Sequence, residues 1–500
     1  MTRDATAIGA GLAPARDARP IRSGERIHVV GAAGAGASAA ALLAAAGGAI
    51  VTACDAGGPS PYTEAFEGAG IAFVTGHAAS HVTADPPPDR LAVTKALTAI
   101  DADHPELAAA RERGIPVEAW QQVVADAAHG RTLVAVAGTH GKSTTSGWLV
   151  HLLVEAGLDP CAFVGALLPG DLTGGAPATA RAGEGRAFVV EADEYAGNFD
   201  AYRPTIAVLT SVEWDHPDVF ADDAAVRATF EDWLTSVRDG GTIVANVADA
   251  GVAAVIDRLD PRTRVFRVAV DGMDADLRGR IVRADPDGTS LELEGLPGGD
   301  GHPVLVTLPT AGRHNAANAM VVAGAAVVLG VTREDIVRGL RTFRGVGRRL
   351  ERKGEAAGVV VYDDYGHHPT AIRETIAAIR QREPDRRVWA VYEPLTYHRT
   401  AALGTAFAAS LATADAVVIA DIWAGRDPDL TIASAAGLAD LVADARPGIT
   451  ASAPGSVDAT ADWLARNVRD GDAVLVMGGG QSYRIATGLL ERLQGDAARR

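Results

Sequence analysis

The stretch that decides the fold reads Val134-Ala-Val-Ala-Gly138-Thr-His-Gly141-Lys142-Ser143-Thr144-Thr145. It predicts an apolar strand over 133–137, a glycine turn and a helix that begins at Ser143. Backbone N–H groups of such a turn hold phosphates, Lys142 can neutralise the terminal phosphates, and Ser143 can hold Mg²⁺. The usual loop has a further glycine where this chain has Val136, so GTHGKS is a short variant. A turn without chemistry is disfavoured because Lys142 is one of only three lysines in the chain.

Acidic residues follow two more predicted strands. The strand at 187–190 leads into Glu191-Ala-Asp193-Glu194, and the strand at 206–210 leads into a segment that contains Asp215-His216. Ligands of a parallel sheet bind beyond the carboxyl ends of its strands. Carboxylates suit a hard cation, and one histidine can complete such a site. Together the two clusters predict a metal site beside the phosphate loop.

Outward from this region, strand-like and helix-like segments alternate, which is typical of α/β domains. Residues 263–308 instead alternate in polarity, with Asp287-Gly288 as a hairpin turn, and predict an antiparallel β appendage on the central domain. The expected division is a disordered leader at 1–21 followed by three α/β domains at 22–126, 127–344 and 345–500.

Composition excludes several classes of protein. The 500 residues carry 46 Lys and Arg against 63 Asp and Glu, a formal charge of −17, which disfavours a nucleic-acid partner. Two cysteines, Cys54 and Cys161, form no disulfide framework, so a cytoplasmic location is expected. The uncharged segment 31–50 is mostly Ala and Gly and predicts a strand, turn and helix rather than a membrane span.

The ordered series of motifs resembles the Mur ligase family. The matching stretches are Gly138-Thr-His-Gly-Lys-Ser-Thr, Glu191-Ala-Asp-Glu, Asp215-His216, Gly312-Arg-His-Asn315-Ala-Ala-Asn318-Ala and Asp363-Asp-Tyr-Gly-His-His-Pro369-Thr. The resemblance implies an N-terminal Rossmann-like domain, a central P-loop ATPase domain and a C-terminal Rossmann-like domain. It also implies an amide ligase that uses ATP and Mg²⁺ through an acyl phosphate. The implied substrates are UDP-N-acetylmuramate and L-alanine, and the implied process is peptidoglycan precursor synthesis. The chain is expected to be a monomer or a homodimer.

The resemblance also implies roles for individual residues. Lys142, Glu191, His216, His367 and Arg399 would be catalytic, and Ser143, Glu191 and His216 would serve Mg²⁺. Tyr365, His367 and Arg399 would face the amino acid. The residues that would contact ATP are Gly138, Thr139, His140, Gly141, Lys142, Ser143, Thr144, Asn315, Arg349 and Asp364.

The N-terminal run Gly31-Ala-Ala-Gly34-Ala-Gly36-Ala-Ser38 follows a predicted strand, with Asp55 about 20 residues beyond Gly36. The family resemblance implies that Gly31, Gly34, Gly36, Ser38 and Asp55 bind the UDP-sugar. The same pattern occurs in nicotinamide-dinucleotide sites, so a dehydrogenase is an alternative.

The last domain departs from the family pattern. Leu395 stands where the alanine-adding member has a histidine, and leucine cannot hydrogen-bond a carboxylate. His398, three positions later, either compensates or is an exposed neighbour of Arg399. Other motifs resemble the member that attaches a tripeptide, although Asp421-Ile-Trp-Ala-Gly-Arg426-Asp favours the alanine-adding one. A nucleotide-sugar binder without catalysis is the alternative from another class.

Overall fold

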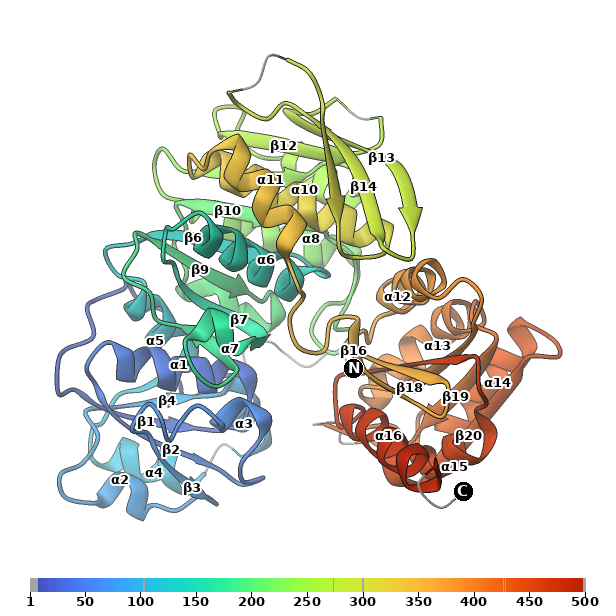
Figure 1. The fold of residues 1–500 in the computed structure, drawn as a ribbon. Helices are drawn as coiled ribbons and strands as arrows, with labels where there is room; N and C mark the ends of the chain where they lie inside the picture. The colour runs from blue at the N-terminus through green and yellow to red at the C-terminus, as the bar shows by residue number, and fades with distance from the viewer. Residues whose placement is uncertain are drawn as a thin grey trace.

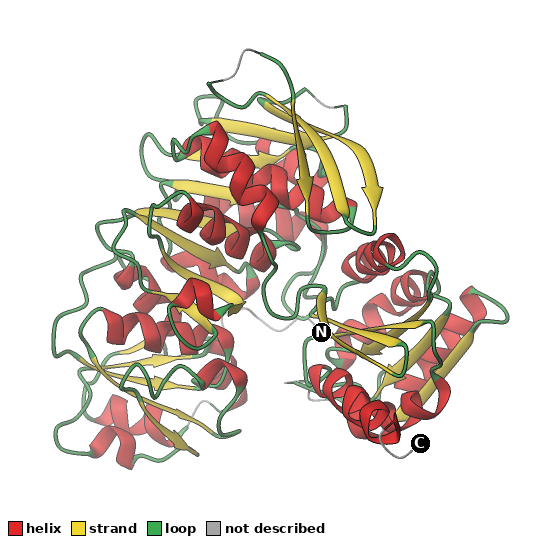
Figure 2. Ribbon diagram, viewed as in Figure 1, coloured by secondary structure: helices red, strands yellow, loops and turns green. Residues whose placement is uncertain are grey.

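The computed structural model describes residues 8–101, 104–272, 274–298, 301–425, 427 and 429–497. The described chain forms three lobes, each built on its own sheet (Figure 1). Helices cover the sheets of all three lobes (Figure 2). The predicted three-domain α/β fold is therefore confirmed. No helix among the described residues is long and apolar enough to cross a membrane.

The first domain has a five-stranded parallel sheet in the order β3-β2-β1-β4-β5. Alternate side chains of β1 point to opposite faces. Val29 packs with α1 and α5, whereas Val30 packs with α2 and α4. Its elements are β1 (Arg26–Val30), α1 (Ala35–Ala46), β2 (Ile50–Asp55), η1 (Pro61–Thr63), β3 (Ala72–Thr75), α2 (Ser80–Thr83), β4 (Arg90–Val93), α3 (Lys95–Ile100), α4 (Pro105–Glu112), β5 (Val117–Ala119) and α5 (Trp120–Ala127).

The prediction of a disordered leader is wrong for residues 8–21, and residues 1–7 lie outside the described residues. Ile8 is buried, and the Ala13 N–H donates to the carbonyl of Val117. Arg16 pairs with Glu118 and with Asp126, in each case at 2.8 Å. Two buried carboxylates therefore hold a segment whose Ala, Gly and Pro content is typical of disorder.

Replacing Arg16 with alanine should destabilise the first domain by about 2 kcal/mol, because two buried acceptors lose a partner. Hydrogen exchange of peptides from β1 and β4 measures this loss locally. Arg22→Ala is the matched control, since Arg22 is 70% exposed and lies 3.8 Å from Glu25. Equal exchange in the two variants would contradict a structural role for Arg16.

The central domain has a ten-stranded sheet in the order β15-β14-β13-β12-β11-β10-β6-β9-β7-β8. Strands β10, β6 and β9 run parallel side by side, so their carboxyl ends meet at one edge. Its elements are β6 (Thr132–Ala137), α6 (Lys142–Glu155), β7 (Cys161–Leu168), α7 (Gly170–Thr173), β8 (Ala178–Arg181), β9 (Ala187–Ala192), η2 (Tyr195–Ala201), β10 (Ile206–Leu209), α8 (Asp223–Leu234), β11 (Thr242–Asn246), α9 (Ala250–Ile256), β12 (Val265–Val270), β13 (Leu277–Asp285), β14 (Gly288–Glu294), β15 (Val304–Leu308), α10 (Arg313–Val328) and α11 (Arg333–Thr342).

The predicted antiparallel appendage is only partly correct. Strands β13, β14 and β15 are antiparallel, and the turn at Asp287-Gly288 joins the first two. However, β12 pairs in parallel with both β11 and β13, so these strands continue the main sheet. An alternating pattern shows that one face is buried but does not fix strand direction.

The C-terminal domain has a six-stranded sheet in the order β16-β17-β21-β18-β19-β20, with only β16 antiparallel. Helices α12, α13 and α14 cover one face, and α15 and α16 cover the other. Its elements are β16 (Glu351–Ala356), β17 (Val359–Asp364), α12 (Pro369–Arg382), β18 (Arg387–Glu393), α13 (Tyr397–Leu411), β19 (Ala416–Ala420), α14 (Ala435–Ala445), β20 (Thr450–Gly455), α15 (Val457–Asn467), β21 (Asp472–Gly478) and α16 (Tyr483–Ala497).

Candidate active site

The glycine turn between β6 and α6 has the backbone that a phosphate loop requires. Gly138 has φ 140° and Gly141 has φ 81°, a region that other residues rarely adopt. A Cβ atom on Gly138 would lie 2.2 Å from the Thr210 hydroxyl. The backbone of Thr139 and of His140 is held by Ser211 at the end of β10, at 2.9 Å in each case. The predicted loop is thus rigidly built, with Thr144 on the first turn of α6.

Lys142 lies against the acidic end of β9. Its Nζ donates to Glu194 at 2.8 Å and to the Gly138 carbonyl at 2.6 Å, and it lies 3.6 Å from Asp193. Burial alone would lower the pKa of Lys142, but the charges of Glu194 and Asp193 outweigh burial and raise it. Lys142 is therefore a fixed cation at the phosphate loop.

The predicted metal residues lie in two adjacent groups. The Ser143 hydroxyl donates to Glu191 at 3.0 Å, as expected for a shared ligand set. His216 instead groups with Asp193 and Glu194, whose ligand atoms lie within 4.8 Å of one another. The sequence motif contained both of these acids, but spacing alone did not distinguish them from Glu191.

This part of the site fits a divalent cation. Three carboxyl groups act on Lys142, those of Glu191, Asp193 and Glu194. The negative charge here therefore exceeds the single positive charge of the lysine. Burial raises the pKa of Glu194, although Lys142 opposes the shift. A hard cation with oxygen ligands would offset this negative charge, which suits Mg²⁺.

The C-terminal domain contributes Arg349 to the same place. Its Nη2 donates to the Ser143 hydroxyl at 2.7 Å, and its guanidinium lies 4.7 Å from the centre of the Tyr365 ring. Asp364 accepts hydrogen bonds from the backbone N–H groups of Leu350 and Gly366, each at 2.7 Å. Arg349 thus reaches the phosphate loop, whereas the contact of Asp364 with ATP stays a prediction.

Arg399 forms a second bridge between the last two domains. It pairs with Asp215 at 2.7 Å, and its Nη2 lies 3.1 Å from His216 Nδ1. Burial would raise the pKa of Asp215, but the charge of Arg399 holds it well below its usual range. Both partners are almost fully buried, so this is a desolvated ion pair.

His367 and Tyr365 lie beside this bridge. Burial, followed by the charge of Arg399, holds the pKa of His367 well below its usual value, so the imidazole is neutral. His367 Nδ1 lies 2.9 Å from the Tyr365 carbonyl, which can only accept. The proton is therefore assigned to Nδ1, and Nε2 is left as an acceptor.

Leu395 and His398, where the chain departs from the family pattern, lie in different surroundings. A Cβ on Gly479 would lie 3.0 Å from the Leu395 side chain and 3.4 Å from the Tyr365 ring, so all three share one wall. The backbone N–H of His398 donates to Asp427 at 2.9 Å, and its ring Nδ1 lies 3.1 Å from the same carboxylate. Compensation for Leu395 by His398 is therefore not supported. Arg426, in the same motif, lies outside the described residues.

Asn315 lies behind the phosphate loop. Its side-chain amide donates to the Ala311 carbonyl at 2.8 Å, and its oxygen accepts from Asn318 at 3.3 Å. Asn318 in turn faces Gly141, where an added Cβ would lie 2.4 Å from its oxygen. The contact of Asn315 with ATP stays a prediction.

The N-terminal glycine run forms a tight turn between β1 and α1. The N–H of Gly31 donates to the Cys54 carbonyl at 2.9 Å, and Asp55 accepts from the Ala33 N–H at 3.0 Å. Gly34 is the residue before α1. At Gly36 a Cβ would lie 2.1 Å from the Trp120 ring, so this glycine permits close packing of α1 against α5.

Ser38 is the exception among the predicted UDP-sugar residues. Its side chain is fully buried, and its hydroxyl lies 2.9 Å from the Thr179 hydroxyl in β8. Direct contact with a ligand is therefore not supported, because Ser38 joins the first domain to the second. The position of Ser38 on the first turn of a helix could not reveal that β8 covers it.

Some contacts of the site were not predicted. Asp215 and Glu194 lie in the predicted acidic clusters, but their pairing with Arg399 and Lys142 was not expected. Tyr62, in η1 of the first domain, lies against Arg348 and Tyr365 of the third. All three domains therefore meet near the phosphate loop, an arrangement that no local motif encodes.

Three domain models match the chain in order. Residues 26–132 match the Mur ligase family catalytic domain, 136–326 the Mur ligase middle domain, and 348–480 the Mur ligase glutamate ligase domain. These matches cover most of the chain and leave the dehydrogenase alternative without support.

Curated relatives and solved structures agree with these matches. UDP-N-acetylmuramate–L-alanine ligase from Kineococcus radiotolerans is 39% identical and covers 94% of this chain and 96% of the relative. The protein of the same name from Mycolicibacterium smegmatis is 36% identical, with coverages of 94% and 95%. The structure of UDP-N-acetylmuramate–alanine ligase from Thermotoga maritima matches with a TM-score of 0.77, 22% identity and coverages of 94% and 99%. That of a murein peptide ligase from Psychrobacter arcticus matches with a TM-score of 0.70, 26% identity and the same coverages.

Proposed function

The chain belongs to the Mur ligase family, and we propose that it joins L-alanine to UDP-N-acetylmuramate in an ATP-dependent reaction. The curated relatives named for this activity match over nearly their whole length. The observation that carries the proposal is the meeting of two domains at the phosphate loop, where Arg349 contacts Ser143 and Arg399 contacts Asp215.

The reaction has two steps. An oxygen of the sugar carboxylate attacks the γ-phosphorus of ATP, which forms an acyl phosphate and releases ADP. The amino group of alanine then attacks the acyl carbon, which forms the amide and releases phosphate and a proton. The first step brings two anions together, and the second develops negative charge on the acyl oxygen and the departing phosphate. Fixed positive charges must therefore stabilise both transition states.

The residues divide this work by position. Lys142 and the loop N–H groups would face the transferred phosphoryl group, and Arg349, which contacts Ser143, would add positive charge from the C-terminal domain. Arg399, held by Asp215, and the neutral His367 form the wall that the incoming amino acid would meet. Mg²⁺, when bound near Glu191 and His216, would neutralise phosphate charge. Gly31, Gly34 and Asp55 would hold the UDP moiety at the N-terminus of α1.

Phosphate release tests this function. ATP, Mg²⁺ and UDP-N-acetylmuramate are combined separately with L-Ala, Gly, L-Ser or the L-Ala-γ-D-Glu-containing tripeptide. We expect release that depends on L-Ala. Release only with the tripeptide would assign the chain to the reaction of murein peptide ligases, and silence with all four would favour a binder without catalysis. Cytoplasmic location and a monomeric or dimeric state stay predictions.

Leu395→His should change the KM for the amino acid more than the KM for ATP, by about 3- to 10-fold. Leu395 shares a wall with Tyr365 and Gly479, so a polar ring there adds a hydrogen-bonding group to the amino-acid side of the site. Initial rates at varied L-Ala and at varied ATP measure both constants. Equal changes in the two KM values would contradict the assignment of Leu395 to the amino-acid pocket.

A further inference from the structure

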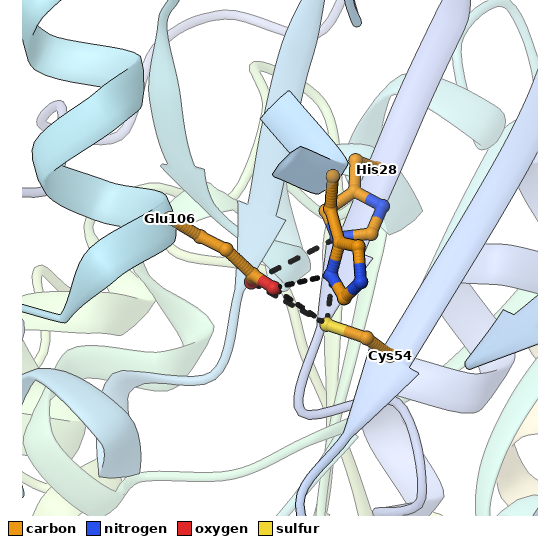
Figure 3. A group of neighbouring side chains, drawn as sticks. His28, Cys54 and Glu106 are labelled. Atoms are coloured by element: carbon orange, nitrogen blue, oxygen red, sulfur yellow. Dashed lines mark hydrogen bonds and ion pairs between the residues drawn. The ribbon is translucent and has the colours of Figure 1, made fainter. Parts of the chain in front are cut away.

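Four side chains of the first domain converge on the sheet face that α2 and α4 cover, and they take no part in the reaction described above. They are His28 from β1, Cys54 from β2, His81 from α2 and Glu106 from α4, and we call them the His–Cys–Glu cluster. Figure 3 shows His28, Cys54 and Glu106 pointing toward one another. Three of the four are essentially buried, and the side chain of His81 is 18% exposed.

Two distances within the cluster match the edges of a tetrahedral coordination sphere, and the others lie within a few tenths of an ångström to about 0.7 Å of that range. Cys54 Sγ lies 3.4 Å from His28 Nε2 and 3.3 Å from Glu106 Oε1, and His28 Nε2 lies 3.8 Å from Glu106 Oε2. Ligands at about 2.0–2.3 Å from a tetrahedral ion are separated by about 3.3–3.6 Å. His81 Nδ1 lies closer to Glu106, at 2.6 Å, and the ligand atoms of all four residues lie within 4.8 Å.

The surroundings of the cluster orient its ligands. His28 Nδ1 lies 2.8 Å from the Thr52 hydroxyl, which leaves Nε2 facing Cys54. Such a partner on the second ring nitrogen is the usual support of a metal-bound histidine. The Ala78 N–H donates to Glu106 at 3.0 Å and fixes the carboxylate.

Two more histidines adjoin the cluster. His77 Nδ1 lies 3.3 Å from Cys54 Sγ and 3.7 Å from Glu106. The His104 ring lies edge-on to the His77 ring at 4.5 Å, and His104 is only 3% exposed. Neither ring nitrogen of His104 has a hydrogen-bond partner. A buried imidazole without a hydrogen-bond partner costs free energy. This region therefore holds polar ring nitrogens that the protein itself leaves unsatisfied.

We propose that the His–Cys–Glu cluster is a structural zinc site, with His28 Nε2, Cys54 Sγ, His81 Nδ1 and one Glu106 oxygen as the four ligands. Thiolate and imidazole ligands favour Zn²⁺ over Mg²⁺. Four protein ligands leave no open position, which is typical of structural rather than catalytic zinc.

Charge balance supports a divalent ion. A thiolate from Cys54 and the carboxylate of Glu106 together carry two negative charges, which Zn²⁺ neutralises in a buried place. Without an ion, the Cys54 thiol donates to Glu106 at 3.3 Å and therefore carries its proton. Zinc binding releases that proton to solvent as the sulfur–zinc bond forms.

The bound ion would stiffen the glycine turn. The Cys54 carbonyl accepts from the N–H groups of both Gly31 and Ala32, at 2.9 and 3.0 Å. Zinc on the Cys54 sulfur therefore fixes the residue that holds this turn, and it ties β1 and β2 to α2 and α4.

The test is retained metal in the full-length protein. The chain is loaded with ZnSO₄ and desalted, and its zinc content is measured by elemental analysis. We expect about one more zinc per chain in the wild type and in Cys161→Ser than in Cys54→Ser, with affinity at least 100-fold weaker in the latter. Cys161→Ser is the matched control because Cys161 is the other cysteine, buried in the central domain.

Cobalt separates this site from the carboxylates at the phosphate loop. Co²⁺ should give a thiolate-to-cobalt charge-transfer band in the wild type and in Cys161→Ser but not in Cys54→Ser. His81→Gln, at a partly exposed position, should lose zinc while its circular dichroism stays native, which covers the case in which Cys54→Ser fails to fold. Absence of the charge-transfer band from the wild type, or equal zinc in folded Cys54→Ser and Cys161→Ser, would overturn the proposal. Full zinc retention in folded His81→Gln would overturn the proposed ligand set.

Discussion

Lys142→Ala should lower kcat by at least about 10³-fold while binding of the UDP-sugar survives. Lys142 donates to Glu194 and to the Gly138 carbonyl, so its ammonium is fixed where the transferred phosphoryl group would lie. Removal of one preorganised charge from a transition state costs about 10²- to 10³-fold, and Lys142 also balances the buried Glu194 and the neighbouring Asp193. Phosphate release measures kcat, and calorimetry measures sugar binding.

Lys353→Ala is the matched control, because Lys353 lies at the surface of the C-terminal domain and pairs only with Glu351 among the contacts described. It should keep wild-type activity. Loss of sugar binding in a folded Lys142→Ala variant would contradict the assignment of sugar and ATP to different domains. Retained turnover would contradict the phosphate loop itself.

The sequence predicted those parts of the site that local patterns encode. The phosphate loop follows a buried strand, and the acids follow neighbouring parallel strands, so strand order alone brings Lys142, Glu191 and His216 to one edge. The partner of each acid could not be predicted from the sequence, because Glu191, Asp193 and Glu194 are almost adjacent. Only the fold shows that Glu194 pairs with Lys142 whereas Glu191 pairs with Ser143.

Contacts between domains could not be predicted in the same way. Arg399 and Asp215 are distant in sequence, and their pairing depends on how the last domain docks on the second. The segment around Arg16 has a composition typical of disorder, and its pairs with the buried carboxylates of Glu118 and Asp126 depend on the fold of the first domain. Ser38 follows the glycine run in sequence, as a ligand contact would, and only the fold shows that Thr179 of β8 contacts its hydroxyl.

Arg399→Ala should destabilise the protein by about 3–5 kcal/mol and lower kcat/KM for L-Ala by at least about 100-fold. The variant leaves Asp215 buried without its partner, and His216 loses the neighbouring guanidinium. Arg380→Ala is the control, because its pair with Asp415 is partly exposed and should contribute at most about 1 kcal/mol. Urea denaturation and initial rates at varied L-Ala measure the two effects.

The loss of stability in Arg399→Ala should depend on pH with a defined sign. In the wild type the pKa of Asp215 lies well below its usual value, so its pairing stabilises the protein above the unfolded-state pKa, and this contribution falls as pH drops through the folded-state pKa. The difference between variant and wild type should therefore be largest near pH 7 and should shrink as pH falls below about 4, the usual pKa of an aspartate. The double variant Asp215→Asn/Arg399→Gln removes both charges, so it should recover most of the stability but not the activity. Full recovery of activity in the double variant would show that Arg399 only neutralises Asp215, and would remove it from the wall that meets the amino acid.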